Sequence, residues 1–256
     1  NLFKSSNNLR CVFSEMNIDA NNLFEWFNAN KLSLNTSKTV FVIFSKSKSQ
    51  NINGFTLKIN GSEIDRQDKV KFLGMHVDSK LDWHHHIKRS ISKINRSLYI
   101  LNQVKHYLSP RNLKTLYYAL IHPYIEYGLL LWGNTHFTYI NKIVILQKKA
   151  IRIINKKPYN FHTNDLFSKS NILKIKELAE FQMIKYMYKY NHNKLPPSLG
   201  FIFCPLNKTH GYNTRTSLII YSPTQNIGRL ANNFWAQLPV KIINAKSFTQ
   251  FKIKTK

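Results

Sequence analysis

Apolar residues recur every three or four positions in several long segments, which is the period of an amphipathic helix. The first segment covers residues 9–28, and later ones cover residues 87–108, 113–120, 139–155 and 172–191. Ser109-Pro110 predicts a helix start, because serine caps free backbone N–H groups and proline fits the first helical position. We therefore expect one helix near the N-terminus and a mainly helical region after Trp83.

Strand patterns occupy most of the stretch between the first helix and Trp83. Residues 39–45 (TVFVIFS) are β-branched and aromatic, which predicts a strand buried on both faces. Asn60-Gly61 predicts a hairpin between residues 55–60 and 62–66, because this pair tolerates positive φ at both turn positions. Residues 70–78 predict one more strand, interrupted by Gly74. The fold class is α+β, with a small antiparallel part followed by a mainly α-helical part.

The C-terminal quarter gives a weaker pattern. Residues 194–229 are rich in proline and glycine and are expected to be mostly irregular. A short apolar element is expected within residues 234–253.

The charge is strongly positive and unevenly distributed. Lys and Arg number 38 against 12 Asp and Glu, a formal charge of +26 in 256 residues. Residues 1–82 are nearly balanced at +3, whereas residues 83–256 carry +23. Such a long stretch with few carboxylates points to a polyanionic partner, most often nucleic acid. A/T-rich coding, which favours lysine, asparagine and isoleucine, is the alternative source of the charge, although it does not explain the asymmetry.

Several classes of protein are excluded. The two cysteines, Cys11 and Cys204, exclude a disulfide scaffold and a thiolate zinc site, and we expect both to be small core residues. No apolar run is long enough to span a membrane. The chain begins at Asn1 without a signal-peptide pattern, so we expect an intracellular protein, nuclear or cytoplasmic and not secreted.

Catalytic signatures are missing as well. None of the twelve carboxylates forms an adjacent acidic pair of the kind that two-metal nucleotidyl transfer uses. Glu63 and Asp65 alternate along a predicted strand, where a solvated edge is expected. His84-His85-His86 cannot converge on one ion from a helix, so the triplet predicts a helix N-terminus and no metal site.

Four ordered blocks carry a resemblance that covers nearly the whole chain. The first is Trp26-Phe27, Asn30-Lys31-Leu32-Ser33-Leu34-Asn35 and Lys38-Thr39, and the second is Lys71-Phe72-Leu73-Gly74-Met75, Val77-Asp78, Leu81 and Trp83. The third comprises Leu116-Tyr117, Ala119-Leu120-Ile121, Pro123, Tyr127-Gly128 and Leu146-Gln147-Lys148-Lys149-Ala150-Ile151-Arg152. The fourth comprises Thr214-Arg215, Trp235, Leu238-Pro239 and Ser247-Phe248. In sequence and order these blocks resemble the jockey-like reverse transcriptases of non-LTR retrotransposons.

The resemblance implies part of an RNA-directed DNA polymerase, a right hand with palm and thumb. Residues 1–82 would be the end of the palm, 83–135 the thumb and 136–256 a C-terminal region. The family's metal-binding aspartates would lie upstream of Asn1, so we expect residues 1–256 alone to be inactive and to hold no catalytic metal, Mg²⁺ being the cofactor of the intact enzyme. The implied partners are an RNA template, a DNA primer and the upstream palm and fingers, with no membrane.

The resemblance also assigns candidate site residues. Lys38 would be a general acid for departing pyrophosphate, with a solvated lysine as the alternative, and Phe72, Leu73 and Gly74 would form the primer grip. Basic residues on two predicted helices would follow the phosphates of the template–primer duplex: Lys88, Arg89, Lys93 and Arg96, then Lys148, Lys149 and Arg152. A non-catalytic nucleic-acid-binding protein derived from such an element shares these basic faces and remains the alternative.

Overall fold

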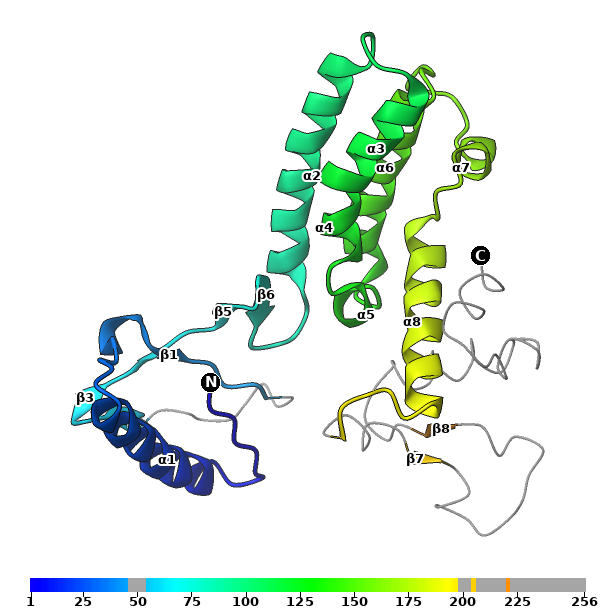
Figure 1. The fold of residues 1–256 in the computed structure, drawn as a ribbon. Coiled ribbons are helices and arrows are strands. Elements are labelled where there is room, and N and C mark those ends of the chain that lie inside the picture. Colours follow the sequence, from blue (N-terminus) through cyan, green and yellow to red (C-terminus); the bar gives the residue numbers. More distant parts are fainter. Residues whose placement is uncertain (46–53, 198–203, 206–219, 222–256) are drawn as a thin grey trace. The chain divides into compact units, whose positions relative to one another are not determined.

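The computed structural model describes residues 1–45, 54–197, 204–205 and 220–221. It divides the chain into two units, Asn1–His86 and Ile87–Lys256 (Figure 1). In the first, one long helix lies against short strand pairs, whereas described residues 87–197 of the second are built from helices and their connections. The α+β class expected from the sequence is confirmed.

The first unit is organised around α1, Leu9–Ala29, which agrees with the predicted helix. Its apolar stripe contributes Phe13 and Ala20 to a small core that also contains Leu57, Ile59 and Ile64. Two asparagines one turn apart add polar contacts, since Asn17 Oδ1 accepts the Lys58 N–H at 2.7 Å and Asn21 Oδ1 accepts the Asn60 N–H at 2.9 Å. The helix therefore satisfies backbone donors of the strand segment that it covers.

Short strand pairs complete this unit. β1, Val40–Phe41, pairs in parallel with β4, Asp65–Arg66. β2, Lys58–Ile59, pairs antiparallel with β3, Ser62–Glu63, across Asn60 (φ 47°) and Gly61 (φ 74°), which confirms the predicted hairpin. Glu63 and Asp65 are exposed, as expected of a solvated edge.

Two of the predicted strands differ from the structure. The strand predicted over residues 39–45 is reduced to Val40–Phe41, and both residues are only half-buried, so the expected burial on both faces is wrong. The strand is short because β4 pairs with only two of the residues 39–45. The single strand predicted over 70–78 is in fact a hairpin of β5, Lys69–Phe72, and β6, Met75–Asp78, because Leu73 and Gly74 reverse the chain.

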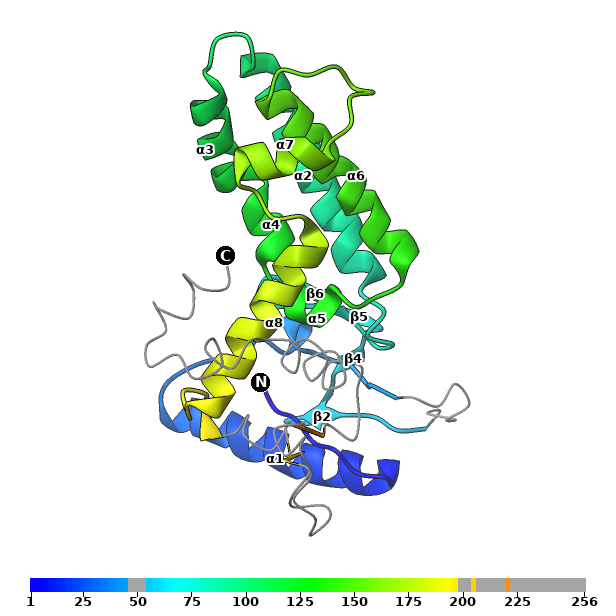
Figure 2. The same ribbon diagram turned by 90° about the vertical axis from the view of Figure 1, so that its right-hand side faces the viewer.

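The second unit is a helical bundle (Figures 1 and 2). Its helices are α2 (His84–Val104), α3 (Pro110–Leu120), α4 (His122–Glu126), α5 (Leu129–Trp132), α6 (Phe137–Ile154), α7 (Asn164–Ser170) and α8 (Ile175–Asn191). As predicted, Ser109 caps α3, its hydroxyl accepting the Asn112 N–H at 3.3 Å. The most buried large side chains include Trp132, Tyr117, Tyr188, Ile94 and Leu113. These residues come from α2, α3, α5 and α8, so helices distant in the sequence share one core.

Other sequence expectations need correction or fall outside the described residues. Residues 172–191 were expected to form one helix, but α8 begins at Ile175 and the separate short α7 precedes it. Cys11 is exposed on α1, so its predicted burial is wrong, because position 11 lies outside the apolar stripe that faces the strands. The apolar element expected within residues 234–253 lies outside the described residues. Most of residues 194–229 also lie outside them, and the described part includes the strand pair β7 (Cys204–Pro205) and β8 (Ile220–Tyr221).

No helix in the described part of the chain is both long enough and apolar enough to cross a bilayer.

Candidate nucleic-acid interface

The first component of the candidate interface is the basic face of α2, defined by Lys88, Arg89, Lys93 and Arg96. All four side chains are exposed, whereas Ile87, Ile94 and Leu101 on the other side of the helix are buried. Arg89, Lys93 and Arg96 follow one another at i, i+4 and i+7, a single stripe about 10 Å long. α2 contains no acidic residue, so no carboxylate on the same helix neutralises these charges.

Aromatic contact orients one of these cations. The Lys93 ammonium lies 5.0 Å from the centre of the Tyr124 ring, which belongs to α4. Such a cation–π contact limits the positions that the long side chain samples while leaving its charge intact.

The second component is the basic stripe of α6, Lys148, Lys149 and Arg152. Lys148 and Lys149 are exposed, opposite the buried Leu146 and Ala150. Arg152 is half-buried, and its Nε–H donates to the carbonyl of Phe161 at 2.8 Å. This arginine therefore anchors the segment that follows α6, a role that the helical period alone does not reveal.

Lys38 stands at the end of a single 3₁₀ turn, Thr36–Lys38. Asn35 organises this turn, because its side-chain Oδ1 accepts the Lys38 N–H at 3.1 Å and its carbonyl accepts the Thr39 hydroxyl at 2.9 Å. The spacing of Asn35, Lys38 and Thr39 thus has a local cause, since an asparagine cap reaches the third following residue. The Lys38 side chain is exposed, and Thr39 separates it from β1.

Phe72, Leu73 and Gly74 lie at the tip of the β5–β6 hairpin. Leu73 (φ 46°) and Gly74 (φ 82°) both adopt left-handed conformations, the geometry of a tight two-residue hairpin turn. Phe72 is half-buried and packs edge-to-face on Phe3, with ring centres 6.2 Å apart. Leu73 is 75% exposed, so the tip presents an apolar side chain beside a glycine that lets another chain approach closely.

Asp78, to which the sequence assigned no role, ties this hairpin to the start of α2. Its buried carboxylate accepts the N–H of Asp82 at 3.0 Å and of Trp83 at 3.1 Å, one on each oxygen. Leu81 (φ 55°) and Trp83 (φ 63°) have left-handed conformations that are costly for large residues, so these bonds hold a strained turn. The detectable signal is an aspartate at a strand end followed by a short polar turn before a helix.

The histidine triplet begins α2, as expected. The Asp82 carboxylate accepts the His84 N–H at 2.8 Å, and the buried His86 accepts the His76 N–H through Nδ1 at 3.4 Å. Hairpin and helix start are thus joined through both Asp78 and His86. Lys38 and the hairpin tip belong to the first unit, and the seven basic residues of α2 and α6 belong to the second.

Comparison with known proteins reveals three similar polymerases. The RNA-directed DNA polymerase from mobile element jockey of Drosophila melanogaster is 29% identical over 152 residues, which cover 56% of this chain and 16% of the relative. The corresponding protein of Drosophila funebris is 28% identical over 185 residues, 69% of this chain and 19% of the relative. A probable RNA-directed DNA polymerase from transposon BS of Drosophila melanogaster is 24% identical over 159 residues, 60% and 17%. The chain thus resembles RNA-directed DNA polymerases of non-LTR retrotransposons of the jockey kind.

No family model and no solved structure matches the chain. The chain spans less than a fifth of the length of the relatives that it matches. The match therefore concerns one segment of a much longer kind of protein.

We predict that Asp78 stabilises the first unit. Replacing Asp78 by asparagine should lower the free energy of unfolding by about 2 kcal/mol, because an amide cannot accept both N–H groups and the bonds to the charged acceptor are lost. Urea denaturation followed by circular dichroism measures the change. Asp68→Asn is the matched control. Asp68 is exposed, and its Oδ1 forms a solvent-exposed ion pair with Nη2 of Arg66 at 3.7 Å, so this substitution should lower the free energy of unfolding by less than about 0.5 kcal/mol. Equal midpoints for both variants would show that the buried carboxylate does not hold the turn.

Proposed function

We propose that this chain supplies the primer grip and the template–primer binding helices of an RNA-directed DNA polymerase, with an RNA template and a DNA primer as partners. The observation that carries the proposal is the basic face of α2, four exposed cations on a helix without acidic residues. Exposed lysines and arginines on one helix face can neutralise phosphates of a nucleic-acid backbone. The basic stripe of α6 adds Lys148, Lys149 and Arg152, although the bond to Phe161 engages one edge of the Arg152 guanidinium.

The hairpin tip fits the role of a primer grip. Phe72 anchors the tip on Phe3, and Leu73 and Gly74 project from it. Backbone without a Cβ at Gly74 allows the sugar–phosphate chain of a primer to come close. The bonds of Asp78 and His86 connect this hairpin to the first residues of α2 within the first unit.

Lys38 is proposed as the general acid for the leaving pyrophosphate. An ammonium next to the triphosphate both neutralises developing charge and donates a proton to the departing oxygen. The exposed side chain at the end of the Asn35 turn supports this role, because a rigid backbone lowers the cost of positioning a long side chain.

The aspartates that hold Mg²⁺ are proposed to come from another part of the polymerase. Among the residues that the structure describes, no three His, Cys, Asp or Glu side chains gather closely enough to bind a metal ion.

Primer extension and binding, measured side by side, test this function. Purified residues 1–256 should bind an RNA template with a recessed DNA primer, with an affinity that falls steeply as salt rises. The same protein, given Mg²⁺ and nucleoside triphosphates, should not lengthen the primer. Binding that is independent of salt would overturn the proposed interface. Template-dependent synthesis would overturn the proposal that the Mg²⁺-binding aspartates come from another part of the polymerase. An in-frame (Phe/Tyr)-Ala-Asp-Asp directly upstream in the gene would support this proposal.

A further inference from the structure

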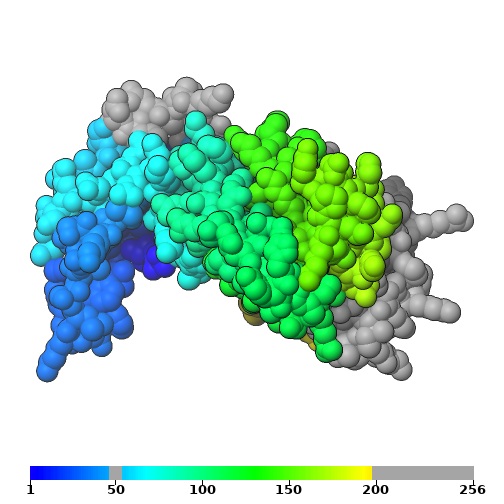
Figure 3. Space-filling model, turned by 90° about the horizontal axis from the view of Figure 1, so that it is seen from above, coloured from blue at the N-terminus to red at the C-terminus, as the bar shows by residue number. Residues whose placement is uncertain are grey.

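Two highly exposed tyrosines lie at one end of the helical bundle. Tyr107 is 88% exposed in the α2–α3 turn, and Tyr159 is 89% exposed in the loop between α6 and α7. Both connections lie at the same end of the bundle in Figures 1 and 2. Figure 3 looks onto this end and shows the green and yellow-green side chains of both regions at the surface. We call these two connections the bundle end.

The α6–α7 loop is held in place by its own hydrogen bonds. The Lys157 N–H donates to the Arg152 carbonyl at 2.9 Å, and the Arg152 Nε–H donates to the Phe161 carbonyl at 2.8 Å. The Phe161 N–H closes a turn on the Pro158 carbonyl at 3.2 Å, with Tyr159 inside it. The turn therefore fixes the backbone of Tyr159 while leaving its ring in solvent.

The base of the loop is tied to the next helix. The Asn155 side-chain amide donates to the Ile151 carbonyl and to the Ser170 hydroxyl, both at 2.9 Å, which joins the end of α6 to the end of α7. A ring displayed on a fixed backbone loses little freedom when it binds a ligand.

Charge at the bundle end is entirely positive over long stretches of sequence. Lys156 and Lys157 precede Tyr159, Lys105 precedes Tyr107, and no Asp or Glu occurs between residues 83 and 125 or between residues 127 and 164. A ligand of this surface is therefore expected to be anionic.

We infer that the bundle end is a binding site for single-stranded nucleic acid. Unpaired bases stack on Tyr159 and Tyr107, and the flanking lysines neutralise the phosphates. In a duplex the faces of the bases are covered by neighbouring pairs, so the exposed rings favour unpaired nucleotides. Acidic peptides would satisfy the lysines but offer no flat partner for the tyrosines. The site is distinct from the basic face of α2, and it extends the proposed function by adding the unpaired part of a template.

The affinity of purified residues 1–256 for a twelve-nucleotide uridine strand tests this site. Tyr159→Leu should weaken binding about tenfold, and Tyr107→Leu should have a similar effect, because leucine keeps the apolar character but removes the stacking face. Tyr159→Phe and Tyr107→Phe are the matched controls and should bind as the unchanged protein does. Replacing Lys156 and Lys157 by glutamine should lower the slope of log affinity against log salt by about 1.4.

A blunt-ended hairpin duplex and a polyglutamate peptide complete the experiment. Neither leucine variant should alter duplex affinity, which depends on the basic face of α2, so failure here and failure of the proposed duplex binding give different results. The inference is overturned if the leucine variants bind the uridine strand as tightly as the unchanged protein. It is equally overturned if they lose affinity for polyglutamate in parallel, since the surface would then bind acidic chains in general.

Discussion

Replacing Lys88, Arg89, Lys93 and Arg96 together by glutamine should flatten the salt dependence of template–primer binding by about 3 to 4 in the slope of log affinity against log salt. Each phosphate contact contributes about 0.9 to that slope for a duplex, and all four side chains are exposed on one helix. At 0.1 M salt the affinity itself should fall about a hundredfold or more. Filter binding or fluorescence anisotropy over a range of salt concentrations measures both quantities.

A control of equal charge separates the basic face of α2 from net charge. Lys31, Lys80, Lys169 and Lys176 are exposed and lie outside both basic stripes. Replacing these four by glutamine removes the same formal charge and should leave the slope nearly unchanged. If both sets of substitutions lower the slope equally, the positive charge acts as a diffuse field, and A/T-rich coding becomes the better account of the lysines on α2.

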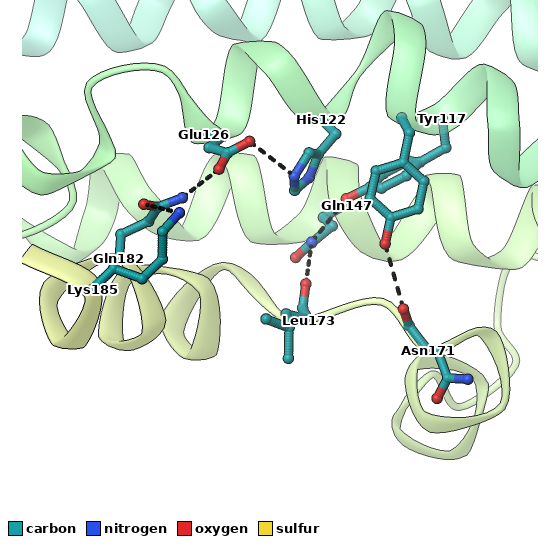
Figure 4. A network of polar contacts seen from close by, with 9 residues as sticks. Tyr117, His122, Glu126, Gln147, Asn171, Leu173, Gln182 and Lys185 are labelled. Carbon is teal, nitrogen blue, oxygen red and sulfur yellow. Dashed lines mark hydrogen bonds and ion pairs between the residues drawn. The ribbon is translucent and has the colours of Figure 1, made fainter. Parts of the chain in front are cut away.

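Replacing Gln147 by leucine should destabilise the helical unit by about 4 kcal/mol. Gln147 is 1% exposed on α6 and joins three segments (Figure 4). Its Oε1 accepts the Ile175 N–H at 3.0 Å, and its Nε2 donates to the Tyr117 hydroxyl at 3.1 Å and to the Leu173 carbonyl at 2.9 Å. Leucine of similar size fills the space but leaves three polar groups without this partner, of which the Tyr117 hydroxyl and the Ile175 N–H are buried.

The contribution of the bond to the Tyr117 hydroxyl can be measured separately with a second substitution. Burial raises the pKa of this tyrosine, so the hydroxyl stays neutral and depends on hydrogen bonding. Adding Tyr117→Phe to Gln147→Leu removes one of the deprived groups and should recover about 1 kcal/mol of the free energy of unfolding. Urea denaturation measures all variants, with exposed Gln103→Leu as the control expected to change stability by less than about 0.5 kcal/mol. A Gln147→Leu protein as stable as this control would contradict the importance of the network.

Local signals explain which elements the sequence could predict. The stripe of α1, the apolar period of α2 and the Ser109-Pro110 start of α3 involve residues within one or two helical turns of each other. The Asn60-Gly61 turn is equally local, since two adjacent residues determine its geometry. The outward direction of Lys88, Arg89, Lys93, Arg96, Lys148 and Lys149 follows from the same periods.

Features that depend on distant partners could not be predicted in this way. The strand expected over residues 39–45 is limited to two residues by the short β4, which lies more than twenty residues away. Leu73 takes a positive φ because β5 and β6 pair around it, although leucine alone disfavours that conformation. The seven residues of α7 are too few for a helical period to stand out.

The sequence by itself therefore determined the fold class, the helices with a strong period, the positive charge of the second unit and the resemblance to jockey-like polymerases. Tertiary structure alone decided that Gln147 joins three segments, that Arg152 anchors a loop and that Tyr107 and Tyr159 stand in solvent. The physical reason is the distance along the chain between the residues that interact. Helical period and net charge are summed over neighbouring residues, whereas the burial and hydrogen bonding of one side chain depend on which remote segments fold against it.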